Sequence, residues 1–381
     1  MHASSHADRP LERRGRGRWP ALDGLRAVAI GLVIAGHIAH DIWIAAIGVE
    51  LFFVLSGFLI TRLLVDEYAQ NGRIAVGVFW VRRALRIFPA FYVALFVGAL
   101  LLRGSPDMPP QDTWIASATY LSDYHFALHP QPSALSHTWS LAVEEQFYLL
   151  WPLALALLLK GGHSRAMMAL ALLAAGITLW RVWLQEVIGA SQGYLYFAFD
   201  TRADFLAAGA MLGLAWDTGW FQDRRARIAP RAWSPLLTGA GLIVVGGIAD
   251  PALGHAVSFP VKVALTALFL AQLLVLGGRG VWTILDTSTM RWLGALSYSL
   301  YLYHLLAWPY AATIRGTVGR IVFWLVTALA AAAASYYAVE RPMLRIRDRV
   351  FPTRSAGAGP AATAGAGFDS QAVMTRASLH A

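Results

Sequence analysis

The sequence has no cysteine among its 381 residues. This absence excludes a disulfide framework, a cysteine-ligated metal site and a thiol nucleophile. Three catalytic or nucleotide-binding patterns are also missing: a glycine-rich phosphate loop after a strand, the metal motif H-E-x-x-H and the nucleophile turn G-x-S-x-G. Charge is scarce as well, since 14% of residues are charged and 57% are hydrophobic. A soluble domain is therefore excluded, and a membrane protein without a metal site is predicted.

Apolar runs recur along the whole chain, and ten of them are long enough to cross the hydrocarbon core as helices. They predict an all-α membrane protein, a bundle of about ten transmembrane helices. The first run is too long for the core of a signal peptide and is expected to remain as a span. The predicted spans are about 22–41, 45–65, 87–103, 140–159, 166–186, 198–216, 235–250, 259–277, 292–314 and 319–339.

The distribution of arginine predicts the orientation of the bundle. Arginines collect in both terminal tails and in the connections after the second and sixth spans, whereas the long connection 104–140 has neither Lys nor Arg. Since basic residues favour the cytoplasmic side, both termini are predicted to be cytoplasmic, in an inner membrane. Only Arg315 and Arg320 go against this pattern. The predicted domains are a basic cytoplasmic tail (1–20), a transmembrane domain (21–345) and a disordered cytoplasmic tail (346–381).

The net charge of +9 follows from this topology. A basic soluble face with a reading motif, which a nucleic-acid partner needs, is not evident. We therefore predict membrane lipids and no nucleic acid among the partners.

Arg26 and His37 are ionisable residues inside the first predicted span, which makes them candidates for function. Eleven residues of helix return to the same face about 16 Å further along. His37 is a candidate general base, and Asp41, four residues on, is expected to orient its imidazole. The alternative is a histidine near the interface that is hydrogen-bonded to a carbonyl group.

Trp139 and Ser140 lie at the start of the fourth predicted span, which carries two adjacent carboxylates, Glu144 and Glu145. These glutamates are expected in the outer half of the membrane, near the depth of His37. Adjacent residues point in different directions on a helix, so at least one carboxylate should face the bundle interior and need a partner there. Alternatively, one of them completes a capping box at the interface.

Arg82, Arg83 and Arg86 precede the third predicted span on the inner side. Guanidinium groups suit phosphate oxygens, so these residues are candidates for holding a phosphorylated co-substrate. Anchoring of the helix by basic residues on the cytoplasmic side is the alternative.

Two further polar groups lie within apolar segments. Their residues are expected either to pair and pack with one another or to hold a polar acceptor. They are Arg181, Asp200, Arg202 and Asp204 in one group, and Tyr301 and His304 in the other.

With these residues in place, the chain resembles the acyltransferase-3 family of multi-pass membrane acyltransferases. The resemblance is carried by six motifs that occur in the expected order over most of the chain. They are Leu22-Asp23-Gly24-Leu25-Arg26-Ala27 through His37, the stretch 48–58, Arg83-Ala84-Leu85-Arg86, the stretch 139–148, the stretch 297–301 with His304, and Glu340-Arg341-Pro342.

The resemblance implies transfer of an acyl group, usually acetyl from acetyl-CoA, to a hydroxyl of a sugar or glycosylated acceptor. It implies a ten-helix core, sometimes followed by a soluble extracytoplasmic hydrolase-like domain. Because the chain stops after its tenth span, the core alone is expected to perform the transfer. Acyl-CoA is expected as a co-substrate, with no tightly bound cofactor.

The predicted roles combine the resemblance with the residue chemistry. His37 acts as general base or acyl relay, assisted by Asp41, Glu144 or Glu145, while Arg26, Arg82, Arg83 and Arg86 hold the CoA phosphates. The residues predicted to bind the acceptor are Trp139, Ser140, Arg181, Asp200, Arg202, Asp204, Tyr301 and His304.

A transporter or flippase of a glycan or lipid-linked sugar is the alternative. It would use the same polar residues to line a path, but it would need inverted repeats and interrupted helices. No internal repeat is evident, although Gly239, Gly241, Gly246 and Gly247 would make the seventh predicted span flexible.

Overall fold

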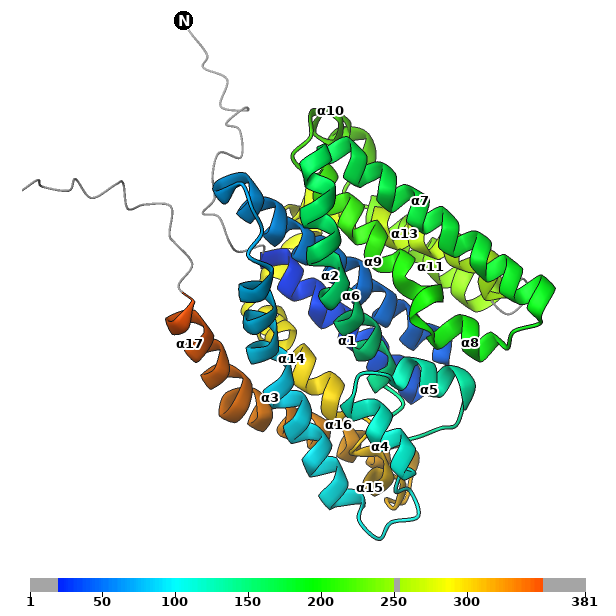
Figure 1. Cartoon of the computed structure of the whole chain (residues 1–381). Coiled ribbons are helices and arrows are strands. Elements are labelled where there is room, and N and C mark those ends of the chain that lie inside the picture. The colour runs from blue at the N-terminus through cyan, green and yellow to red at the C-terminus, as the bar shows by residue number, and fades with distance from the viewer. Residues whose placement is uncertain (1–19, 250–253, 352–381) are drawn as a thin grey trace, which may run out of the picture. The chain divides into compact units, whose positions relative to one another are not determined.

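The computed structural model describes residues 20–249 and 254–351, so the predicted tail regions 1–19 and 352–381 lie outside the described residues. The described part is helical and contains no β-strand, which confirms the all-α prediction (Figure 1). The first half contains α1 (Pro20–Ala39), α2 (Ile42–Asn71), α3 (Val76–Leu102), α4 (Gln111–Ala118), α5 (Ser122–Leu128), α6 (Thr138–Leu158), η1 (Leu159–Gly161), α7 (His163–Trp183), η2 (Leu184–Ile188) and α8 (Gln192–Phe197). The second half contains α9 (Phe199–Ala215), α10 (Gly219–Ile228), α11 (Ser234–Val244), η3 (Val245–Ala249), α13 (His255–Leu276), η4 (Gly280–Asp286), α14 (Ser288–Tyr303), α15 (Trp308–Ala312), α16 (Thr317–Ser335), η5 (Tyr336–Glu340) and α17 (Arg341–Val350).

Seven helical segments in the described part are long and apolar enough to cross a membrane. The other three predicted spans correspond to α9 with 17 residues, to α11 followed by η3, and to α14 with 16 residues. At 1.5 Å per residue, each of these reaches about 26 Å or less, short of the roughly 30 Å hydrocarbon core. The count of ten spans and the cytoplasmic location of the termini therefore stay predictions.

The centre of the bundle is built on α2, which packs against α1 on one side and α9 on the other. Two glycines allow α2 and α9 to approach closely. A Cβ atom added to Gly57 would lie 2.0 Å from the carbonyl oxygen of Leu206, and one added to Gly209 would lie 2.0 Å from that of Val54. Small residues at such crossings let helix backbones meet inside a membrane.

A similar close approach joins α1 to α14. A Cβ atom added to Gly294 would lie 1.8 Å from the carbonyl oxygen of Asp23. This contact holds the start of α1, with Arg26, beside the helix that carries Tyr301.

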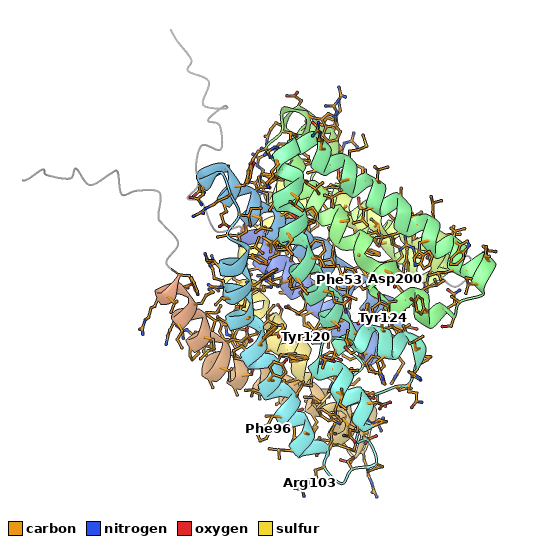
Figure 2. The ribbon with its side chains drawn as sticks, viewed as in Figure 1. Phe53, Phe96, Arg103, Tyr120, Tyr124 and Asp200 are labelled. Carbon is orange, nitrogen blue, oxygen red and sulfur yellow. The ribbon has the colours of Figure 1, made fainter. Side chains whose placement is uncertain are left out.

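Apolar side chains cover the outside of the bundle. Leu172 and Leu179 on α7 are 65% and 70% exposed, and Phe96 points away from α3 with 65% exposure (Figure 2). Large apolar side chains on the outer faces of long apolar helices are expected to contact lipid.

The connection 104–140 is not an open loop but folds into α4 and α5, which pack on the start of α6. The side chains of Ser117 and Thr138 are hydrogen-bonded at 3.0 Å. Gln146 donates to the carbonyl oxygen of Tyr120 at 3.1 Å and to the Asp123 carboxylate at 3.0 Å. These bonds hold the connection against α6.

Several boundaries differ from the predicted ones. Helix α3 begins at Val76 rather than near residue 87, so Arg82, Arg83 and Arg86 lie within this helix and do not precede it. The first span ends at Ala39, because His40 has a φ of 57° and breaks the helix before α2 begins. The predicted span 292–314 is interrupted after Tyr303 and resumes as α15. Helix α17 runs to Val350, so the first residues of the predicted disordered tail are helical.

We predict that Gly209→Ala lowers the free energy of unfolding by about 1–3 kcal/mol, because the added methyl group must push α2 and α9 apart. Gly176→Ala on α7 is the matched control, since a Cβ atom there meets nothing within 4 Å. The control should be neutral or up to about 1 kcal/mol stabilising, because alanine favours helix over glycine. Thermal unfolding in detergent measures both, and equal melting temperatures would contradict the close contact.

Candidate active site

A cavity lined by both charged and apolar side chains lies inside the bundle. Its walls come from α1, α2, α3, α6 and α14. The lining side chains are Arg26, Val49, Phe52, Phe53, Ser56, Arg83, Arg86, Ile87, Ser140, Leu141, Glu144, Glu145, Ser297, Tyr298 and Tyr301. Sequence segments that are far apart thus contribute to one site.

Three arginines bring positive charge to this cavity. Arg26 comes from α1, where it pairs with Asp23 at 3.4 Å. Arg83 and Arg86 are three residues apart on α3 and therefore share one side of that helix. The Arg83 guanidinium lies 3.8 Å from the ring centroid of Tyr148. Arg82, which the sequence grouped with them, does not line the cavity.

The two predicted carboxylates, Glu144 and Glu145, line the same cavity as the arginines. Glu144 accepts hydrogen bonds from Ser56 Oγ at 3.1 Å and from the Tyr148 hydroxyl at 2.7 Å. From the sequence, we predicted the arginines on the inner side of the membrane and the two glutamates in its outer half. They meet because Arg83 is about 10 Å along α3 from its first residue, well inside the bundle rather than at its surface.

Three histidines form a second polar group beside the cavity. The ring centroids of His37 and His304 are 5.0 Å apart, and those of His137 and His304 are 5.4 Å apart. His137 Nδ1 and His304 Nε2 are buried and form no hydrogen bond with the described residues. These three imidazoles are not arranged to hold a metal ion, and neither is any other group of three or more His, Asp or Glu residues in the described part of the chain.

Tyr301 connects the histidines to the cavity, because it lines the cavity and its ring centroid lies 5.4 Å from that of His304. Its hydroxyl is 2.6 Å from Ser140 Oγ, another cavity residue, and donates to the carbonyl oxygen of His137 at 3.0 Å. A continuous polar region therefore runs from the arginines to His37.

The His37 imidazole is held by its own helix and by His304. His37 Nδ1 lies 2.7 Å from the carbonyl oxygen of Val33, the geometry of an Nδ1–H donor. This tautomer leaves Nε2 free to accept a proton. Asp41, expected to orient His37, is exposed beyond the end of α1, so the i, i+4 geometry on one helix does not exist. In the described part, neither Asp41 nor the two glutamates form a hydrogen bond with His37.

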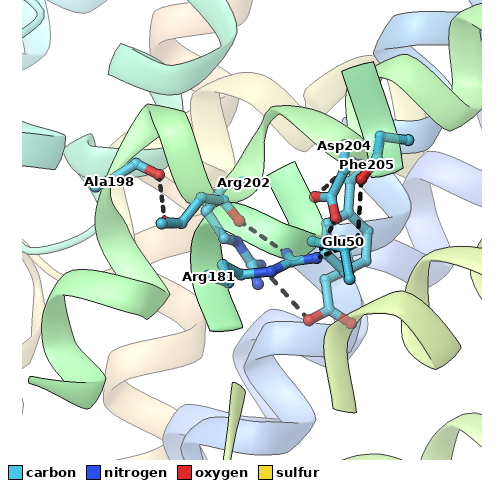
Figure 3. Close-up of polar contacts among 9 residues, drawn as sticks. Glu50, Arg181, Ala198, Arg202, Asp204 and Phe205 are labelled. Carbon is cyan, nitrogen blue, oxygen red and sulfur yellow. Dashed lines mark hydrogen bonds and ion pairs between the residues drawn. The ribbon is translucent and has the colours of Figure 1, made fainter. Parts of the chain in front are cut away.

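The residues Arg181, Arg202 and Asp204, predicted to hold an acceptor, are buried and paired inside the bundle (Figure 3). Arg181 pairs with Asp204 at 2.6 Å, and Arg202 pairs with Glu50 of α2 at 3.5 Å. Asp200 accepts hydrogen bonds from Trp180, at 2.6 Å, and from Tyr124 of α5, at 3.2 Å (Figure 2). The structure thus contains the predicted pairing, and binding of an acceptor by these residues stays a prediction.

Glu50 anchors this buried charge network, because Lys262 of α13 also contacts its Oε1 atom, at 2.7 Å. Five aromatic rings surround the Arg202 guanidinium within 5.8 Å, including those of Trp139 and Phe53. Aromatic faces attract a cation and favour burial of the guanidinium. Trp139 is itself 5% exposed and packs into this network.

Several residues of the buried charge network and of the histidine group were not predicted from the sequence. Glu50 and Lys262 are charges within apolar runs, a signal that was present but not used. His137 precedes α6, and its neighbours across the bundle come from α1 and α14, so only the fold could show its place in the cluster.

The family model described as an acyltransferase domain matches residues 19–340. The chain belongs to the acyltransferase-3 family. This confirms the resemblance drawn from the six motifs, and the matched region includes both the cavity and the three histidines.

The relatives of this acyltransferase-3 chain include peptidoglycan O-acetyltransferase OatA of Listeria monocytogenes, 30% identical over 369 residues, covering 85% of this chain and 55% of that protein. The putative peptidoglycan O-acetyltransferase YrhL of Bacillus subtilis is 30% identical, with 88% and 56% covered. O-acetyltransferase OatA of Staphylococcus aureus is 29% identical, with 87% and 58% covered. The chain thus spans just over half the length of these relatives. No solved structure matches it significantly.

We predict that Glu50→Gln lowers the free energy of unfolding by about 3–5 kcal/mol, because it removes the carboxylate that two buried cations share. Asp107→Asn, at an exposed position, should leave stability within about 0.5 kcal/mol of wild type. Thermal or denaturant unfolding of the purified proteins compares them. Equal stability of the two variants would show that the network contributes little.

Asp123 of α5 allows a pH-dependent prediction. Burial, the largest cause, raises the pKa of this carboxyl from 3.8 to about 6. Between pH 3.8 and about 6, the folded protein therefore keeps a proton on Asp123 that the unfolded chain has released. This contribution to the stability of the folded state is lost as the pH rises through about 6. Asp123→Asn should remove this loss of stability at high pH. The melting temperature of the variant minus that of wild type should therefore be larger at pH 7.5 than at pH 4.5. A pH-independent difference would contradict this assignment.

Proposed function

We propose that this protein is a membrane-bound O-acyltransferase that moves an acyl group, acetyl in the first instance, from acyl-CoA to a hydroxyl of a sugar polymer. The observation that carries the proposal is the continuous polar region from the arginine-lined cavity through Tyr301 to His37. Family membership supports acyl transfer. The names of two relatives specify peptidoglycan, which supports a peptidoglycan-like acceptor.

The cavity supplies groups for the donor. Arg83 and Arg86, with Arg26, present guanidinium groups that suit the phosphates of CoA. Glu144 and Glu145 offset part of this charge, so the cavity is not left with three uncompensated cations. A donor held there would extend its thioester toward Ser140 and Tyr301.

His37 then removes the proton of the acceptor hydroxyl. As the hydroxyl oxygen attacks the thioester carbon, the new C–O bond forms, the C–S bond breaks, and His37 Nε2 takes the proton and passes it to the departing thiolate. General-base catalysis of this kind is worth about 10²- to 10⁴-fold in rate. In the alternative order, Nε2 attacks the thioester first, so that the C–N bond forms, the C–S bond breaks and the CoA thiolate leaves. The hydroxyl oxygen then attacks the acyl carbon, the C–N bond breaks, and the hydroxyl proton passes to the thiolate.

The proposal assigns His37 to the chemistry and Arg86 to donor binding. Purified His37→Ala in nanodiscs should bind acetyl-CoA like wild type but transfer acetyl to peptidoglycan fragments at least about 100-fold more slowly. Arg86→Ala should bind acetyl-CoA about 10- to 100-fold more weakly, the range for a lost charge-assisted hydrogen bond. Calorimetry gives the affinity and radiolabelled acetyl the turnover.

His129→Ala and Arg103→Ala remove the same side-chain types at exposed positions and serve as controls. Wild-type turnover by folded His37→Ala would rule out both roles of His37. A folded wild-type protein that binds no acyl-CoA would refute the enzyme proposal and make sugar transport the next assay.

A further inference from the structure

A second depression lies apart from the proposed active site, where α10 meets the ends of α11 and α13. None of its lining residues lines the first cavity. We call this depression the α10 groove and describe it by its charged edge, its apolar wall and its polar floor.

The charged edge consists of Arg224 and Arg227, which are three residues apart on α10 and so lie on one side of that helix. Within the described part of the chain, neither forms an ion pair. Arg224 donates to the carbonyl oxygen of Trp220 at 3.2 Å, and its guanidinium carbon lies 4.6 Å from the centroid of that ring. Arg225, between them, points elsewhere, with its guanidinium 5.0 Å from the ring centroid of Trp216. Of the nearby acidic residues, Asp217 pairs with Arg62 at 2.7 Å, and Asp223 is exposed on α10.

The wall of the α10 groove is apolar and open to the outside of the bundle. Trp233, Leu237 and Leu268 line it with exposures of 45%, 62% and 38%. On the floor, the Thr238 hydroxyl donates to Gln272 at 2.9 Å, so these two polar side chains already satisfy each other. Positive charge without a carboxylate partner among the described residues thus lies next to apolar surface.

We propose that the α10 groove binds one anionic phospholipid. The phosphate lies between Arg224 and Arg227, and one acyl chain runs along Leu237 and Leu268. A basic site between helices at the end of membrane-spanning segments is where an anionic headgroup can be held. Anchoring of a helix by basic residues alone requires neither a shared face nor an adjoining apolar groove. The inference does not depend on the proposed function.

Native mass spectrometry of the purified full chain tests this site. Wild-type protein titrated with phosphatidylglycerol should retain one lipid that phosphatidylcholine does not displace. Arg224→Ala/Arg227→Ala should retain it about 30-fold more weakly, because each basic residue near an anionic headgroup contributes about fivefold. Arg345→Ala/Arg349→Ala removes the same charge from exposed positions on α17 and should retain the lipid like wild type.

Three results would overturn the proposal. Equal losses in both double variants would show that the lipid responds only to net charge. Displacement of the lipid by millimolar inorganic phosphate would identify a free-anion site instead. As a check on position, phosphatidylglycerol with brominated chains should quench Trp233, and the quenched fraction of fluorescence should fall in Trp233→Phe; no fall would place the lipid elsewhere.

Discussion

Hydrocarbon supplies no hydrogen-bond partners, so polar groups inside this bundle must find their partners in other helices. Helix α2 provides that meeting place. It carries Glu50, which pairs with cations of α9 and α13, and Ser56, which donates to Glu144 of α6. Both contacts require α2 to lie deep among its neighbours, and Gly57 and Gly209 make the approach of α9 possible. Loss of this close packing would disturb the charge network and the cavity together.

The two polar groups of the bundle differ in composition, although both contain buried polar atoms without a hydrogen-bond partner among the described residues, such as Arg202 Nη1 and His304 Nε2. In the charge network, Arg181, Arg202 and Lys262 have carboxylate partners and are fully buried. In the active-site region, buried nitrogens of His137 and His304 have no partner among the described residues, and an open volume lies beside them. Phe53 lies between the groups, since it lines the cavity and its ring centroid is 5.8 Å from the Arg202 guanidinium carbon. We infer that the charge network mainly stabilises the bundle, while the cavity holds the reacting groups.

Much of the fold could be predicted from the sequence, because apolar runs and arginine-rich loops are local properties. The all-α class and the family followed from such patterns. Helix lengths did not, because the breaks after Ala39 and Tyr303 depend on local backbone geometry rather than on hydrophobicity. The sequence brought out His37, Arg83 and Glu144 as separate candidates. Their common site depends on contacts between α1, α3, α6 and α14, which no single segment encodes. The partner of His37 was wrongly predicted for the same reason: spacing pointed to Asp41, whereas packing brought His304.

We propose that one site holds the donor's phosphates at the arginines and its reacting end near His37. Cryo-electron microscopy of the protein in nanodiscs with a non-hydrolysable thioether analogue of acetyl-CoA tests this most directly. The predicted map shows the phosphates against Arg83 and Arg86 and the acyl end beside Tyr301 and His37. Analogue density outside this cavity, or an acyl end directed away from the three histidines, would contradict the claim.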